Sequence, residues 1–291
     1  MSISFDERFE VLRELGSGEF ADVSEVRDRD SGALFALKRS RDGASLKNEF
    51  AMTRAAAHAG VVCVHELGVH NGASAFTMEL LVGDDLITHV RKDLVLPAPG
   101  GPHLPMAFGQ PLQAVGSSLF RRCSDEGLRR LRSSLAMLTE VLAHVHQLGM
   151  VHRDLQPANV RVASDGGLTL IDFGLTARQG ATTATPSLGA PSHIAPEDAA
   201  GVAAHVESDW YAIGVLLFEA LTGELPFAGT GQDVLLRKQT VSAPAPSFFV
   251  DNIPRDLDAL CRGLLQPSQN LRFGAPQLFE CLTLQTVTGR P

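Results

Sequence analysis

Short apolar runs separated by turns fill the first eighty residues of the chain. They predict strands at 9–15, 23–27, 34–38, 61–69 and 75–79, with turn residues such as Asp30-Ser31-Gly32 between them. The stretch 46–58 is instead typical of a helix. We therefore expect a mostly antiparallel sheet that carries one helix.

The pattern becomes helical from about residue 128. Apolar residues then recur at spacings of three and four, which places them on one face of a helix. These positions are Leu128, Leu131, Leu135, Leu138, Leu142 and Val145. Helical patterns return at 208–221 and 253–265, and the two halves join near 80–85. A chain of 291 residues is long enough for one large domain or for two packed lobes that share a cleft.

The segment 94–118 differs from both halves, because it holds five prolines and four glycines in 25 residues. Such a composition disfavours regular structure and predicts an excursion over the surface. The excursion is either a passive insertion or a docking loop. We find no internal repeat along the chain.

Composition narrows the class of protein. A net charge of −8 disfavours a general nucleic-acid binder, because phosphate binding needs a basic face. The spacing of the four cysteines fits neither a metal site nor a redox pair, so we expect reduced thiols and a cytoplasmic protein. They are Cys63, Cys123, Cys261 and Cys281. We expect no membrane segment, since the longest apolar stretch, 211–218, is too short to span a bilayer. We expect no signal peptide, since residues 1–7 show neither a basic n-region nor an apolar h-region.

Candidate chemistry begins at a glycine turn. Gly16 and Gly18 let a strand-to-strand turn pass close over phosphates with backbone N–H groups facing the oxygens. Ala21 stands where a dinucleotide site needs a third glycine, and a strand follows instead of a helix, so that reading is disfavoured. Lys38 ends a later strand and can reach phosphates, provided that an acid such as Glu49 holds it.

The segment 151–160, Val-His-Arg-Asp-Leu-Gln-Pro-Ala-Asn-Val, carries the most specific pattern. Asp154 can accept the proton of a substrate hydroxyl. Asn159 and Asp172, eighteen residues after Asp154, offer hard oxygen ligands for magnesium on phosphates. The turn at 165–167 predicts a hairpin that brings the two segments side by side.

With these segments the chain resembles the eukaryotic-type (Hanks-type) Ser/Thr protein kinase family over about residues 9–281. Ala195-Pro196-Glu197 resembles the anchor that ends the family's activation segment, and Asp209-Trp210-Tyr211 resembles the start of its central helix. Arg272 stands where the family keeps the buried partner of the anchoring glutamate. The Ala-rich, Arg-over-Lys composition indicates a bacterial member.

The resemblance implies an α+β, two-lobed protein kinase fold, with a small, mostly antiparallel β lobe and a larger, mainly helical lobe. It implies one kinase domain over 1–291, divided into an N-terminal lobe at about 9–80, a hinge at 81–85 and a C-terminal lobe at 86–281 that contains the insertion 94–118. The implied reaction transfers the γ-phosphoryl group of ATP, with Mg2+ or Mn2+, to Ser or Thr hydroxyls of proteins. The protein substrate is unknown.

The resemblance also implies a role for each matching residue. In catalysis, Asp154 orients the acceptor hydroxyl, Glu49 holds Lys38, and Lys38 holds the α- and β-phosphates. Arg153 and Gln156 complete the catalytic set. The residues implied in ATP binding are Gly16, Gly18, Val23, Ala36, Lys38, Met78, Glu79, Leu81, Asp85 and Arg161. The implied metal ligands are Asn159 and Asp172.

Three positions depart from the family. Gln156 replaces a lysine that contacts the transferring phosphate, and Ala190 replaces a threonine that contacts that lysine. Loss of a cation beside developing charge lowers the rate by about 10²-fold, so we expect attenuated transfer. Arg161 replaces an aliphatic residue under adenine, and it either stacks on the base or swings out.

Alternative functions remain at this point. One is a pseudokinase that binds nucleotide or acts as a scaffold, and another is a small-molecule kinase of the aminoglycoside type, which would lack the anchor at 195–197. Dual specificity also stays open. If the chain is active, we expect autophosphorylation at Thr182, Thr183, Thr185 or Ser187, with Arg153 meeting the phosphate. Arginines at 121, 122, 129, 130 and 132 form either a solvated helical face or an acidic docking site.

Overall fold

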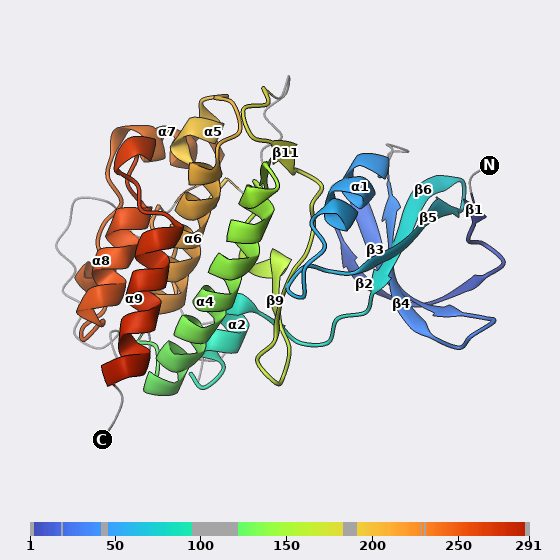
Figure 1. Ribbon diagram of the computed structural model, residues 1–291, viewed down its shortest axis with the longest axis horizontal. Helices are drawn as coiled ribbons and strands as arrows, with labels where there is room; N and C mark the ends of the chain where they lie inside the picture. The colour runs from blue at the N-terminus through green and yellow to red at the C-terminus, as the bar shows by residue number, and fades with distance from the viewer. Residues whose placement is uncertain are drawn as a thin grey trace.

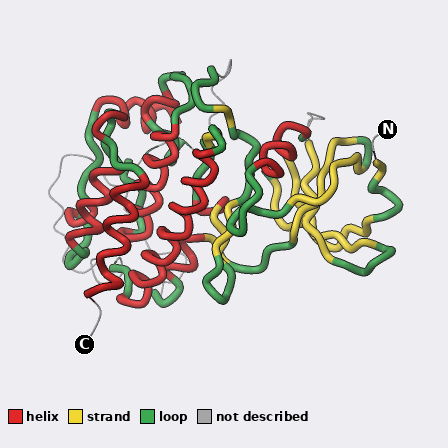
Figure 2. The backbone as a smooth tube through the Cα atoms, viewed as in Figure 1, coloured by secondary structure: helices red, strands yellow, loops and turns green. Residues whose placement is uncertain are grey.

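A computed structural model describes residues 3–18, 20–41, 46–94, 122–182, 191–227, 229 and 231–288. The chain forms two lobes arranged along its long axis, one rich in strands at the N-terminal end and one of packed helices (Figures 1 and 2). This is the α+β, two-lobed arrangement that the sequence predicts. Of the segment 94–118, all but Leu94 lies outside the described residues, so neither interpretation of the insertion is tested.

The N-terminal lobe is a six-stranded sheet in the order β1-β5-β6-β4-β3-β2, and only the β1–β5 pair is parallel. Its strands are β1 (Ile3–Ser4), β2 (Phe9–Ser17), β3 (Ala21–Asp28), β4 (Leu34–Ser40), β5 (Val64–His70) and β6 (Ala73–Glu79). The predicted helix is α1 (Lys47–Ala55), which is shorter than the predicted 46–58. The five strands expected from the sequence are confirmed, except that residues 61–63 lie outside β5.

The C-terminal lobe contains the three helices that the sequence predicts and several that it does not. Its helices are α2 (Leu86–Arg91), α4 (Asp125–Gln147), α5 (Pro196–Ala199), α6 (Val206–Thr222), α7 (Gly231–Thr240), α8 (Arg255–Leu264) and α9 (Ala275–Thr288). Its short strands are β7 (Asp84–Asp85), β8 (Met150–Val151), β9 (Val160–Val162), β10 (Leu168–Leu170) and β11 (Ala177–Arg178). Three single 3-10 turns lie at Pro157–Asn159, Pro246–Phe248 and Gln269–Leu271.

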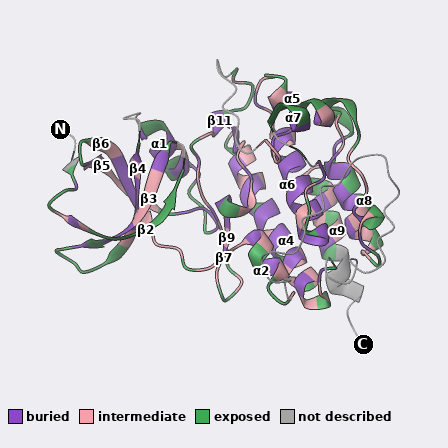
Figure 3. Ribbon diagram, turned by 180° about the vertical axis from the view of Figure 1, so that it is seen from behind, coloured by how far each residue is buried: buried purple, intermediate pink, exposed green. Residues whose placement is uncertain are grey.

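Helix α6 forms the centre of this lobe, and Figure 3 shows it buried along most of its length. A helix that is apolar all round must be covered on every side, and α4, α8 and α2 pack around it. It ends at Gly223, whose φ of 78° is the left-handed conformation that closes many helices. Helix α6 is therefore a buried central element on which the neighbouring loops of the lobe can pack.

The predicted hairpin is present, and it joins the lobe to the hinge. Strands β9 and β10 pair antiparallel, and β9 also pairs with β7 at the end of the hinge. Gly83 has a φ of 157°, and a Cβ placed there would lie 2.2 Å from the carbonyl oxygen of Val162. Only glycine lets the hinge lie this close to β9.

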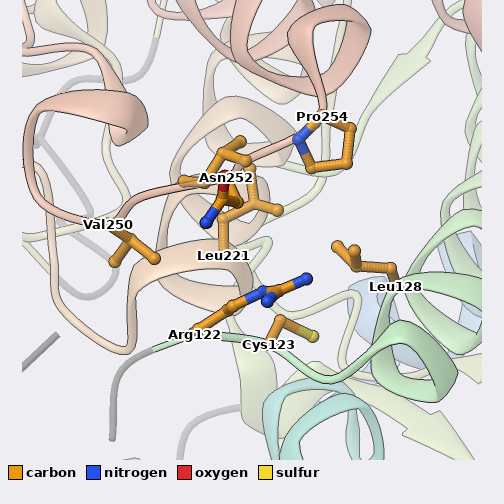
Figure 4. Close-up of a pocket in the computed structure, with 8 residues that line it drawn as sticks. Arg122, Cys123, Leu128, Leu221, Val250, Asn252 and Pro254 are labelled. Atoms are coloured by element: carbon orange, nitrogen blue, oxygen red, sulfur yellow. The ribbon is translucent and has the colours of Figure 1, made fainter. Parts of the chain in front are cut away.

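Two arginines of α4 and a small pocket stand out on the surface of the C-terminal lobe. Arg130 and Arg132 pair with Asp93 and Asp256 at 2.5 and 2.7 Å, so these two arginines hold α4 to its neighbours and are not a solvated face. Figure 4 shows a small pocket between the start of α4, the end of α6 and the loop before α8, lined by residues such as Cys123, Leu221 and Pro254.

The cysteines and the helices also bear on the expectations from composition. All four cysteines are free, as expected for reduced thiols. Within the described ranges, no helix is long and apolar enough to cross a membrane.

Candidate active site

A lysine held between two carboxylates lies where the two lobes meet. Lys38 on β4 places its Nζ 2.7 Å from Oε1 of Glu49 on α1 and 2.9 Å from Oδ1 of Asp172, which follows β10. Asp172 lies 134 residues from Lys38 in sequence. The tertiary fold thus brings together three of the residues that the sequence singles out, from three separate segments.

Burial and charge shape the electrostatics of this trio. Burial, together with the negative charge of Asp172, raises the pKa of Glu49 to about 7, against the opposing effect of Lys38. Burial alone would lower the pKa of Lys38, but the charges of Asp172 and Glu49 outweigh it and raise that pKa. Burial would raise the pKa of Asp172, and Lys38 overrides this and lowers it. The trio therefore holds an ammonium group and an ionised Asp172 in a poorly solvated place.

A second cluster surrounds Asp154 in the loop before β9. Gln156 donates its Nε2 to both carboxylate oxygens of Asp154, at 3.1 Å each. Asn159 donates its Nδ2 to Oδ2 and to the backbone carbonyl of Asp154, at 2.8 Å each. Burial is the main reason that the pKa of Asp154 is raised. The departure Gln156 thus contacts the predicted base directly, through a neutral amide.

The two clusters lie next to each other. The N–H of Ile171 donates to the carbonyl of Asn159 at 2.9 Å, which ties the residue before Asp172 to the Asp154 loop. The ring of His152 packs edge-on against Phe173 at 4.8 Å between centroids, and its Nε2 lies 3.2 Å from the carbonyl oxygen of Ile171. The predicted catalytic and metal-binding residues are therefore in one place.

Asp209, near the start of α6, holds the Asp154 loop by hydrogen bonds. Asp209 is 1% exposed and accepts hydrogen bonds from the N–H of His152 at 2.9 Å and the N–H of Arg153 at 2.8 Å. The Nε2 of His146 lies 2.7 Å from the same carboxylate. Arg153 has a φ of 69°, a conformation that non-glycine residues adopt only when their surroundings enforce it. Asp209 is a part of that enforcement.

From the sequence, Asp209 was predicted only to lie at the start of a helix. Its role as the acceptor of hydrogen bonds from the Asp154 loop was not predicted. A signal did exist, since an aspartate at the beginning of an otherwise apolar helix is a buried charge that needs donors. The partner His146 gives no comparable signal, because a histidine near the end of a long helix is ordinary.

Residues predicted to bind the nucleotide lie on the neighbouring strands β2, β3, β4 and β6 and at the hinge. The glycine turn is closed by a 2.9 Å bond from the N–H of Gly18 to the carbonyl of Ala21, and Gly16 pairs with Val23 across β2 and β3. Ala36 on β4 pairs with Met78 on β6. The glycine turn is therefore connected to the strand before the hinge through adjacent, paired strands.

Glu79, just before the hinge, and Asp85, at its end, make hydrogen bonds to other residues of the protein. The N–H of Glu79 donates to the carbonyl of Cys63 at 2.9 Å, and its carboxylate accepts from the N–H of Cys63 at 2.7 Å. Asp85 caps α2 by accepting from the N–H and the hydroxyl of Thr88, at 3.0 and 2.6 Å. The roles of Glu79, Leu81 and Asp85 in nucleotide binding stay predictions.

Arg161 adopts an arrangement that the sequence left open. Its guanidinium donates to the carbonyl of Gly83, so the side chain bridges β9 and the hinge. In this arrangement the positively charged guanidinium is hydrogen-bonded to a backbone carbonyl of the protein.

The activation-segment anchor is a buried ion pair. Arg272 donates to both carboxylate oxygens of Glu197, with 2.9 Å between Nη2 and Oε2. It also donates to the carbonyls of Glu207, Gln266 and Pro267 at 2.7, 3.0 and 3.1 Å. Burial would raise the pKa of Glu197, but the hydrogen bonds and charge of Arg272 lower it. The partnership predicted from the sequence is confirmed.

Part of the activation segment is not described. Ala190, Thr183, Thr185 and Ser187 lie outside the described residues, and Thr182 is exposed at the last described position before them. The predicted phosphorylation sites and the second departure, Ala190, are therefore untested by the structure.

Comparison with known proteins matches this arrangement to one family. A protein kinase domain model matches residues 9–282, and the chain belongs to this family. Its two-lobed fold and its resemblance to Hanks-type Ser/Thr kinases are thereby confirmed.

Individual relatives include plant and bacterial proteins. The chain is 31% identical over 270 residues to the serine/threonine-protein kinase AtPK2/AtPK19 of Arabidopsis thaliana, covering 92% of this chain and 52% of the relative. It is 32% identical over 275 residues to the DNA damage-responsive serine/threonine-protein kinase RqkA of Deinococcus radiodurans, covering 89% and 36%. It is 29% identical over 268 residues to the probable serine/threonine-protein kinase PknB of Lactococcus lactis, covering 87% and 38%. The chain thus spans about half or less of the length of these relatives.

Proposed function

We propose that this chain is an ATP-dependent protein kinase domain that transfers the γ-phosphoryl group to Ser or Thr hydroxyls of a protein. The observation that carries the proposal is the convergence of Lys38, Glu49 and Asp172 beside the Asp154 loop. A family match over residues 9–282 and relatives named as serine/threonine-protein kinases support it. The same family match favours a protein kinase over a small-molecule kinase.

In this proposal the nucleotide lies between the lobes. Gly16 and Gly18 cover the phosphates, and Lys38 neutralises part of their charge while Glu49 holds it in place. Adenine meets the hinge through backbone groups of Glu79 and Leu81, with Val23, Ala36 and Met78 around it. Asp85 and Arg161 border this site. Asp85 caps α2, and Arg161 donates a hydrogen bond to the carbonyl of Gly83 in the hinge.

The donor set fits a magnesium or manganese ion. Asn159 donates through Nδ2 to Asp154, which leaves its amide oxygen as an acceptor, and Asp172 is an ionised carboxylate. An amide oxygen and a carboxylate are the hard ligands that Mg2+ prefers. When bound, the ion would neutralise phosphate charge, and Asn159 and Asp172 would hold it.

The chain's own acid–base group is Asp154. Its carboxylate would accept a hydrogen bond from the acceptor hydroxyl and orient the oxygen for attack, then take its proton. Gln156 and Asn159 fix the carboxylate by three hydrogen bonds, so Asp154 has little freedom to turn. Arg153, next to Asp154, would meet a phosphate on the activation segment.

We further propose that residues 1–291 form one kinase domain with lobes at about 9–80 and 86–281 and a hinge at 81–85. The net charge of −8 favours a protein acceptor over a nucleic acid. A cytoplasmic location fits the four free thiols.

The test combines binding and transfer. ATP with magnesium at a hundredfold excess over Kd should stabilise the wild type by about 2.7 kcal/mol, seen as a rise of several degrees in Tm. Asp172→Ala should lose most of that rise, because the variant lacks the carboxylate of the metal site. Asp251→Ala, at an exposed loop position, is the matched control and should keep it.

Labelled ATP then measures transfer to dephosphorylated casein and to the chain itself. Transfer by wild type and Asp251→Ala, but not by Asp172→Ala, supports a kinase. An equal rise in Tm for wild type and Asp172→Ala contradicts the nucleotide site. A magnesium-dependent rise without transfer to either acceptor identifies a pseudokinase instead.

A further inference from the structure

The loop 191–194, Pro-Ser-His-Ile, runs directly into the anchor at Glu197. The anchor and the Asp154 loop share one support, because Ser208 donates to Glu197 at 3.0 Å and the next residue, Asp209, holds the Asp154 loop. Three residues of extended chain reach at most about 10 Å. The 191–194 loop is therefore tied, through Glu197 and the start of α6, to the loop that carries Asp154.

A single buried lysine binds the backbone of this loop. Lys238 on α7 donates through Nζ to the carbonyls of Pro191, Ser192 and Ile194, at 3.0, 2.6 and 2.8 Å. Lys238 is 1% exposed. Within the described part of the chain, no backbone N–H donates to any of these three carbonyls. The loop therefore depends on a side chain from another element for these hydrogen bonds.

The chemistry of the contact matches an ammonium group. An ammonium ion has three protons, and three carbonyl oxygens converge on it. Without a cation, the negative ends of these carbonyl dipoles would repel one another. Burial lowers the pKa of Lys238 to about 7, and its Nζ also lies 5.5 Å from the centroid of the Tyr211 ring. The three carbonyl oxygens favour the charged form of Lys238 and so oppose the effect of burial.

Helix α7 buries two of its residues, Val234 and Lys238, and Figures 1 and 3 show α7 beside α5, which follows the loop. The loop also approaches α6, where Nε2 of His193 lies 3.4 Å from Oε2 of Glu219. The loop thus lies between two helices, and its carbonyls accept hydrogen bonds from Lys238 on α7.

We propose that Lys238 is a positioning residue for the acceptor polypeptide: it fixes the 191–194 loop to α7 so that the acceptor hydroxyl can reach Asp154. The proposal rests on the proposed kinase function. It concerns the acceptor side of the site alone, since Lys238 contacts none of the residues predicted to bind ATP. Its removal should therefore change acceptor binding and leave nucleotide binding intact.

The test uses Lys238→Met, which keeps the length of the side chain and removes the charge and the donors. Lys238→Arg keeps a cation, and Gln239→Met is the control at the neighbouring exposed position of α7. With dephosphorylated casein as acceptor, Lys238→Met should raise KM for casein tenfold or more. KM for ATP and the magnesium-dependent rise in Tm should stay within twofold of wild type. Lys238→Arg should recover part of the acceptor KM, and Gln239→Met should match wild type.

Hydrogen exchange separates this proposal from the kinase function. Amides at 192–202 should exchange at least tenfold faster in Lys238→Met, while those of β9, β10 and α6 stay unchanged. If the wild type transfers no phosphate but this local change is found, the kinase function fails and the anchoring role of Lys238 stands. Unchanged exchange at 192–202, or an unchanged KM for casein in an active variant, overturns the proposal.

Discussion

Replacing Asp209 with asparagine changes one buried oxygen into an NH2 group and keeps the shape of the side chain. In the native structure, Oδ1 accepts from the N–H of Arg153, and Oδ2 accepts from the N–H of His152 and contacts Nε2 of His146. An asparagine oxygen can replace only one of the two carboxylate oxygens. Whichever way the amide is turned, its NH2 group faces one backbone N–H of the catalytic loop.

The expected destabilisation follows from that geometry. One buried N–H without an acceptor costs about 1–3 kcal/mol, and this is our expectation for Asp209→Asn. Asp209→Ala leaves both backbone N–H groups without an acceptor, and we expect about 2–6 kcal/mol from two such groups. Because the same bonds hold Arg153 at a positive φ, both variants should also misplace Asp154 and lower kcat.

The assay is urea unfolding at pH 7, with kcat measured on the same samples and Asp251→Asn as an exposed control. Burial would raise the pKa of Asp209, but its contact with His146 outweighs burial and the pKa is lowered. Asp209 therefore stabilises the fold at pH values above its ordinary pKa of 3.8, and this contribution is lost as the pH falls further. The gap between wild type and Asp209→Asn should shrink below pH 4. The reasoning fails if Asp209→Asn is as stable as wild type at pH 7, or if alanine is tolerated as well as asparagine.

Three further predictions concern Asp198, the pair of Glu197 and Arg272, and Gly83. Burial raises the pKa of Asp198 from 3.8 to about 6, so its ionised form destabilises the fold at higher pH. Asp198→Asn should raise the free energy of unfolding by about 1–3 kcal/mol at pH 8 and by nothing near pH 4, and urea titrations at the two pH values check this. Glu197→Ala strands the buried guanidinium of Arg272 and should destabilise by about 3–5 kcal/mol, whereas adding Arg272→Met should recover part of the loss; thermal unfolding of the single and double variants decides. Gly83→Ala should lower the affinity for magnesium-ATP at least tenfold in a titration, because its methyl group would collide with β9, while Gly32→Ala, with a positive φ but open space, should affect only stability.

The sequence predicted the strands of the N-terminal sheet and three helices of the C-terminal lobe, because apolar side chains recur at a regular spacing along a strand or helix. The apolar face of α4 and the strands of the N-terminal sheet follow from side-chain spacing alone. Residues 61–63 show the limit. Val61 bridges to Leu170 in the other lobe instead of pairing within β5, and an apolar run looks the same whichever strand it meets.

The candidate site divides in the same way. Identity and spacing pointed to Lys38, Glu49 and Asp172, and the structure brings them into contact. The sequence could not give the direction of Arg161, because a side chain on a strand edge can reach a ligand or a carbonyl equally well. Nor could it find Lys238, since one lysine on a mostly polar helix resembles any surface lysine until the loop carbonyls around it are known.

Gln156 shows how a departure from the family can keep a contact while it removes a charge. Its amide reaches both oxygens of Asp154, so the carboxylate keeps two hydrogen bonds with no positive charge in the donor. A neutral donor lowers the pKa of a buried carboxylate less than a cation does, and the pKa of Asp154 is raised by its burial. In the proposed reaction, Asp154 would be a better proton acceptor near neutral pH than it would be beside a lysine, since a base works best when its pKa approaches the operating pH. The transferring phosphate would have one cation fewer, so we expect any loss of rate to arise at the phosphate and not at the base.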